Sequence, residues 1–121
     1  MNIKEYQQLA MRTNDRKATE RLENVLENIM VQDVGGIINA SLGLSGEVGE
    51  LNDMIKKSIF HGHSLDIGEV QKEIGDICWY IAMMCESFGL SMDQVMQQNI
   101  EKLKKRYPDG FSEQASRNRE E

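Results

Sequence analysis

The chain has 121 residues, of which 40% are hydrophobic and 28% are charged, and its net charge is −6. This length suits one domain with a modest core, and the composition is typical of a globular rather than a disordered chain. The acidic balance argues against nonspecific binding to DNA or RNA, which depends on basic patches. We therefore expect no nucleic-acid polymer as a partner. An acidic protein that binds a polyanion needs a divalent cation between the two.

Targeting signals and disulfides are not expected. No apolar run reaches the roughly 20 residues that span a bilayer, and the opening MNIKEYQQLAMRT lacks the apolar core of an export signal. Cys78 and Cys85 lie seven residues apart in a helical pattern, a rise of about 10 Å that is too long for a disulfide within one helix. These features predict a cytoplasmic protein without membrane contact, with reduced thiols and with Cys78 in the core.

Apolar residues recur at helical spacing along most of the chain, which predicts an all-α fold, a bundle of four to five helices. The third predicted helix contains five glycines, which cost about 1 kcal/mol each in a helix interior, so a break near Gly35 and Gly36 is one alternative. The sequence HGHSLD predicts a loop after this helix. The predicted helices are residues 2–12, 18–31, 34–60, 67–88 and 91–106.

One domain is expected to contain all of these helices, over residues 1–111. The remaining residues, 112–121, are polar, and we expect them to form a frayed C-terminal tail.

Two acid pairs are the strongest chemical signal. Glu47 and Glu50 are three residues apart, as are Glu73 and Asp76, so each pair shares one face of its helix. Two antiparallel helices joined by a short loop would bring the four carboxylates together. Four oxygen donors suit a hard cation such as Mg²⁺ or Mn²⁺, and they repel one another unless a cation or proton neutralises them.

An ordinary surface is the alternative, because acid pairs at this spacing are common on solvated helix faces. Glycines beside the pairs, at Gly46, Gly49 and Gly75, favour the metal site. Glycine is a poor choice for a solvated helix face, but it allows a backbone or a ligand to come close.

A basic face is predicted on the last long helix. Asn99, Lys102 and Arg106 lie at positions i, i+3 and i+7 and could bind phosphate oxygens. The alternative is a solvated basic helix end that complements the helix dipole. Lys56 could contribute to phosphate binding or simply face solvent.

Apolar side chains flank the second acid pair. Trp79, Tyr80 and Met83 could form a slot for a nucleotide base, although core packing or a subunit interface explains each of them equally well.

Three segments, GLSGEVGEL, KEIGDICWYI and NIEKLKKRYPDGF, resemble the MazG-like nucleoside triphosphate pyrophosphohydrolases of the all-α NTP pyrophosphatase superfamily. The family signature is Glu-Glu-x-x-Glu, a spacer, and then Glu-x-x-Asp. Glu47, Glu50, Glu73 and Asp76 match four of its five acids, whereas the first glutamate falls at Gly46.

The resemblance implies Mg²⁺-dependent hydrolysis of nucleoside or deoxynucleoside triphosphates to monophosphate and pyrophosphate. It also implies a homodimer or homotetramer whose site is often completed across subunits. Because the glutamate at Gly46 is missing, Glu47 or Glu50 would combine metal binding with the role of base, or metal-bound water would suffice. One alternative is another nucleotide substrate, such as phosphoribosyl-ATP, and a second is a noncatalytic helical module that binds or regulates as an oligomer.

Overall fold

The predicted all-α fold is confirmed. The computed structural model describes residues 1–28 and 33–118, and these ranges contain helices but no β-strand. Contacts divide the chain into two compact units, Met1–Val31 and Gln32–Glu121, and each is described by itself. No helix of the described ranges is long and apolar enough to cross a membrane.

The N-terminal unit contains helix α1 (Ile3–Ala10), a 3₁₀ turn η1 (Met11–Thr13) and helix α2 (Ala18–Asn28). Asn2 and Glu5 form a capping box at the start of α1, each side chain accepting a backbone N–H of the other residue. The first helix therefore agrees with the prediction, except that its last turn tightens into η1. Residues 29–31 of the second predicted helix lie outside the described ranges.

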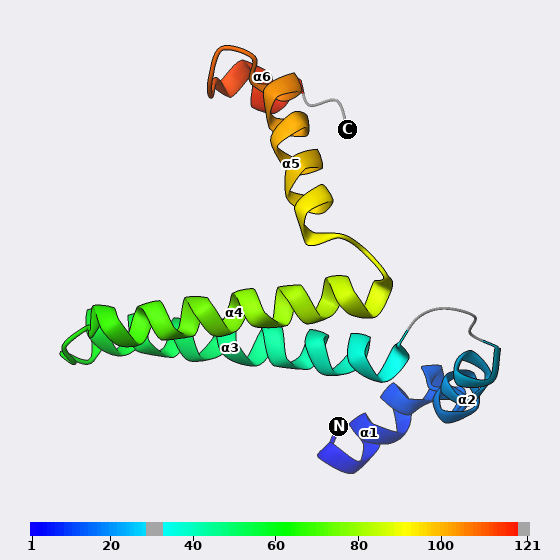
Figure 1. Ribbon diagram of the computed structural model, residues 1–121. Coiled ribbons are helices and arrows are strands. Elements are labelled where there is room, and N and C mark those ends of the chain that lie inside the picture. Colours follow the sequence, from blue (N-terminus) through cyan, green and yellow to red (C-terminus); the bar gives the residue numbers. More distant parts are fainter. Residues whose placement is uncertain (29–32, 119–121) are drawn as a thin grey trace. The chain divides into compact units, whose positions relative to one another are not determined.

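The described residues of the second unit, 33–118, form the helices labelled α3 to α6 in Figure 1. They are α3 (Val34–Phe60), α4 (Ile67–Phe88), α5 (Met92–Arg106) and the short α6 (Glu113–Arg117). The predicted bounds agree with the first three, because Ser91 is the N-cap of α5. Helix α6 lies within the expected tail, where the Ser112 side chain accepts the Ala115 N–H at 3.0 Å. Residues 119–121 of that tail are outside the described ranges.

Helices α3 and α4 lie side by side as an antiparallel hairpin, which Figure 1 shows in cyan to yellow-green. The predicted loop of residues 61–66 joins them, and the Asp66 side chain ends it by accepting the N–H groups of Gly68 and Glu69. Gly89 closes α4 in the left-handed conformation, with φ of 71°. Helix α5 contacts α4 only sparsely.

Helix α3 has no break at Gly35 and Gly36. The Asp33 side chain accepts the Gly36 N–H at 2.9 Å and so caps the first turn. Gly36 is buried, and a methyl group there would collide with Ser87 on α4. The glycine is tolerated in the helix because it permits this close crossing.

The two helices meet along one seam with a seven-residue repeat, the spacing of coiled-coil packing. Gly36 faces Ser87, and seven residues further along α3, Gly43 faces Tyr80. One more step of seven leads to Glu50 and Glu73, whose side chains interact. The acids predicted as metal ligands therefore belong to the same seam as the tightly packed glycines.

The buried core of the described residues is small and lies near the Gly36 end of the seam. Ala40, Cys85 and Ser87 are buried, whereas Cys78 is exposed. The prediction that Cys78 lies in the core is wrong, because nothing in the described chain covers the side of α4 that carries it. Both cysteines are free, as predicted.

Candidate functional site

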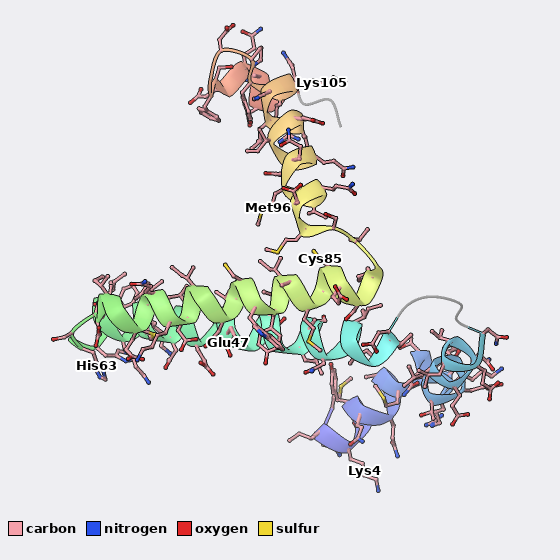
Figure 2. The ribbon with its side chains drawn as sticks, in the orientation of Figure 1. Lys4, Glu47, His63, Cys85, Met96 and Lys105 are labelled. Carbon is pink, nitrogen blue, oxygen red and sulfur yellow. The ribbon has the colours of Figure 1, made fainter. Side chains whose placement is uncertain are left out.

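Three of the four predicted acids come together in the middle of the hairpin. Glu47 on α3 and both Glu73 and Asp76 on α4 each present one carboxylate oxygen, and these oxygens lie within 4.8 Å of one another. Figure 2 labels Glu47 on α3 where it runs beside α4. The antiparallel register explains the cluster, because Glu47 and Asp76 lie about one helical turn, and Glu73 about two turns, on the same side of the Gly43–Tyr80 contact.

The cluster is electrostatically strained. The pKa of Glu73 is raised above the usual range of glutamate. The largest cause is a hydrogen bond between the protonated Glu73 side chain and Glu47. Burial and repulsion by the Glu47 charge raise the pKa further, and the Asp76 charge acts in the same direction. Carboxylates held this close favour a bound proton or a cation.

Two oxygen atoms of the cluster lack hydrogen-bond donors. Oε2 of Glu47 and Oε2 of Glu73 are buried and accept no hydrogen bond from an amide, hydroxyl or cationic group of the described chain. Buried acceptors are normally satisfied. A hard divalent cation prefers carboxylate oxygens, so this set of ligands fits such an ion.

Glu50 lies at the edge of the cluster. It is exposed and is not one of the three residues whose oxygens converge. Glu50 nevertheless hydrogen-bonds to Glu73, and this hydrogen bond lowers the pKa of Glu73. The structure therefore connects all four predicted acids, with Glu50 on the side open to solvent.

A pocket of about 310 Å³ opens beside the cluster and is lined by Glu47, Asp76, Trp79 and Tyr80. The two aromatic rings meet edge to face, with centroids 5.1 Å apart and an interplanar angle of 88°. Acidic and aromatic side chains thus share one cavity. Met83, the third residue predicted for a base slot, does not line this pocket, and its sulfur accepts a hydrogen bond from Asn39 at 3.8 Å.

The residues predicted to bind phosphate do not line this pocket in the described chain. Lys56 is exposed on α3. Asn99 and Lys102 are exposed on α5, and Arg106 lines a different pocket of about 250 Å³ with Lys105, Ala115 and Asn118. A single described chain therefore presents the acids and the aromatic residues together, without these basic side chains.

The glycines beside the acids, Gly46, Gly49 and Gly75, are not in close contact with another helix of the described chain. A methyl group at Gly46, Gly49 or Gly75 would meet nothing within 4 Å in the described chain. Close packing occurs instead at Gly36 and Gly43. The sequence interpretation overlooked Gly43, although its seven-residue spacing from Gly36 and Glu50 is a signal that could have identified it.

Known proteins show similarity over the part of the chain that contains this site. The family model described as MazG nucleotide pyrophosphohydrolase domain matches residues 38–111. One relative is the Gene 37 protein of Mycobacterium phage L5, which is 29% identical over 90 residues, covering 71% of this chain and 79% of that protein. Its name states no activity. No solved structure gives a significant match.

Proposed function

The chain belongs to the MazG nucleotide pyrophosphohydrolase domain family, and we propose that it hydrolyses nucleoside or deoxynucleoside triphosphates to the monophosphate and pyrophosphate. The observation that carries this proposal is the convergence of Glu47, Glu73 and Asp76 at a pocket that also has an aromatic wall. A nucleotide has both a polyphosphate that attracts cations and a planar base, so its two ends match the two kinds of lining.

Mg²⁺ is the proposed cofactor, with Mn²⁺ as a substitute. Glu47, Glu73 and Asp76 would hold it, and Glu50 at the edge of the cluster would complete the set. When bound, such a cation neutralises phosphate charge and lowers the pKa of a coordinated water. The two buried oxygens without donors support this assignment, because a cation would satisfy both.

Glu47 and Glu50 are the proposed catalytic residues. Glu50 is exposed beside the cluster, where a carboxylate can orient a water molecule and accept its proton. The water oxygen would bond to phosphorus as the P–O bond between the α- and β-phosphates breaks, and pyrophosphate would leave. Gly46, at the position of a signature glutamate, offers no side chain for this step, so Glu50 carries the role of base.

The basic residues are assigned to a complete oligomer. We propose that Lys56, Asn99, Lys102 and Arg106 bind phosphate oxygens in a homodimer or homotetramer in which another subunit contributes to the site. Large apolar side chains left exposed on α3 and α4, including Leu42 at 70% and Ile59 at 67%, support an oligomer because burial of such surface drives association. The protein is proposed to act in the cytoplasm.

A product assay tests the function. The protein is incubated with Mg²⁺ and a panel of nucleoside and deoxynucleoside triphosphates together with phosphoribosyl-ATP, and the phosphorus products are separated. Monophosphate and pyrophosphate in equal amounts are expected from at least one triphosphate. Release of orthophosphate would contradict the cleavage position, exclusive turnover of phosphoribosyl-ATP would change the substrate, and no turnover would favour a noncatalytic helical module.

A further inference from the structure

We propose that Gly43 is a positioning residue that seats the Tyr80 ring against the backbone of α3, and that the resulting Trp79–Tyr80 wall contacts the planar base of the substrate. The seating of the ring depends only on contacts within the hairpin. The assignment of the base rests on the proposed function, so the two parts are tested by different measurements.

The contact between Gly43 and Tyr80 leaves no room for a side chain. A methyl group at Gly43 would lie 2.6 Å from Cδ1 of Tyr80 and closer still to Cε1 and Cζ. Cβ atoms do not approach other heavy atoms below 3.0 Å, and the aromatic ring is rigid, so the whole ring would have to move. The glycine is therefore required for the observed ring position rather than for the helix, which it weakens.

The contact between Gly43 and Tyr80 lies next to the pocket that contains the acids. Gly43 precedes Glu47 by four residues on α3, and Tyr80 follows Asp76 by four residues on α4, so the contact lies one helical turn from the carboxylates. Tyr80 itself lines the pocket with Glu47 and Asp76. We expect a shift of the ring to change the pocket wall while the backbone at Glu47 and Asp76, one turn away, keeps its position.

The wall suits a planar aromatic ligand. Trp79 is 60% exposed even though its ring meets the Tyr80 ring edge to face, which leaves a large apolar surface open beside carboxylates. Nucleic-acid bases stack on such side chains regardless of sequence, because every base has an aromatic face. The Tyr80 ring holds its neighbour through the edge-to-face contact, so the seat at Gly43 affects both rings.

Stability and fluorescence measurements test the seat without any substrate. Gly43→Ala is compared with Gly49→Ala, which lies on the same helix and would meet nothing within 4 Å. Gly49→Ala should raise the melting temperature through helix propensity, whereas Gly43→Ala should lower it. Because Trp79 is the only tryptophan of the chain, intrinsic fluorescence reports this wall, and its emission should shift in Gly43→Ala but not in Gly49→Ala.

The same glycine substitution in a Tyr80→Ala variant shows whether the Tyr80 ring causes the loss of stability. In Tyr80→Ala the ring is absent, so adding Gly43→Ala should now raise the melting temperature as Gly49→Ala does. This reversal separates a local clash from general damage to α3. Equal behaviour of Gly43→Ala and Gly49→Ala in the parent protein, in both melting temperature and emission, would overturn the proposal.

Nucleotide measurements test the base. If the parent protein hydrolyses a triphosphate, Gly43→Ala should raise KM about tenfold, the loss of roughly one stacking contact, while kcat changes less than twofold. The KM for inorganic tripolyphosphate as a substrate, which has no base, should stay the same. An unchanged nucleotide KM together with a shifted emission would overturn the base contact and leave the seat established. If no triphosphate is hydrolysed, the proposed function and the base contact fail together, whereas the stability and fluorescence results still decide the seat.

Discussion

The seam between α3 and α4 has a tightly packed region around Gly36 and Gly43 and an acidic region around Glu47 and Glu73. At Gly36 and Gly43 the helices are so close that a methyl group would collide with Ser87 or Tyr80. Toward the loop that joins the two helices, the residues that meet are Glu47, Glu73 and Asp76, whose carboxylates repel one another. The first region holds the helices together, and the second opposes their approach.

This difference shows how a hairpin with a small core can maintain a charged cluster. The buried residues Ala40, Cys85 and Ser87 all lie on the glycine side of the seam, where close contact gains dispersion energy. The acidic side contributes exposed or half-buried carboxylates. We infer that the tight region fixes the spacing of the acids, and that a bound cation relieves the repulsion between them.

The largest expected effect comes from breaking the acidic region. Asp76→Asn removes one charge and one strong cation ligand while it keeps the shape of the side chain. We expect kcat/KM for a triphosphate to fall at least about 100-fold, because even groups that only support metal ligands are worth 10- to 100-fold. Steady-state kinetics at saturating Mg²⁺ measure the change, and circular dichroism checks that the helices persist.

A matched control for this variant is Glu69→Gln on the same helix. Glu69 pairs with Lys72 at 3.0 Å on the exposed surface, and such pairs contribute little. Its activity should remain within about twofold of the parent protein. Full activity in Asp76→Asn would remove Asp76 from the metal site.

A smaller effect is expected from breaking the tight region. Gly36→Ala would press a methyl group against Ser87 and against the Asp33 side chain that caps α3. Overpacking of this kind costs about 1–3 kcal/mol of unfolding free energy. Denaturant unfolding measures the loss, with Gly35→Ala as the control, because a methyl group there would make only an ordinary 3.7 Å contact with Asp33. Equal stability of the two variants would show that the seam is not tight at Gly36.

Much of the fold could be predicted from the sequence. Apolar spacing predicted α3 and α4. The capping residues Asp33, Asp66 and Gly89 explain why the predicted ends agree with the structure. The shared helix faces of the acid pairs likewise predicted that carboxylates would meet. Both signals are local, and each depends on a few neighbouring residues.

Other features depend on contacts between helices, and the sequence did not reveal them. The same residue type occurs at Gly43, where Tyr80 fills the space, and at Gly46, where nothing does, and only the register of α4 distinguishes these positions. Cys78 follows the apolar pattern of α4 but is exposed. Which side of a helix is covered depends on its partner, which helical periodicity alone does not identify.

If a cation relieves the repulsion in the acidic region, removing one of the repelling charges should reduce the effect of that cation, and a comparison of the parent protein with Glu73→Gln tests this. The raised pKa of Glu73 means that the folded protein binds this proton more tightly than the unfolded chain. The resulting stability is present at low pH and is lost as the pH rises through the raised pKa. Without metal, Glu73→Gln should therefore gain stability over the parent protein as the pH rises from acidic to neutral.

Thermal unfolding at pH 7 with and without Mg²⁺ completes this measurement. A ligand that binds only the folded state raises the free energy of unfolding by RT ln(1 + [L]/Kd). We predict that Mg²⁺ raises the melting temperature of the parent protein by several degrees and that of Glu73→Gln by much less. Equal Mg²⁺-induced shifts in the two proteins would show that Glu73 does not bind the cation, and no shift in the parent protein would show that Mg²⁺ does not bind the acidic cluster.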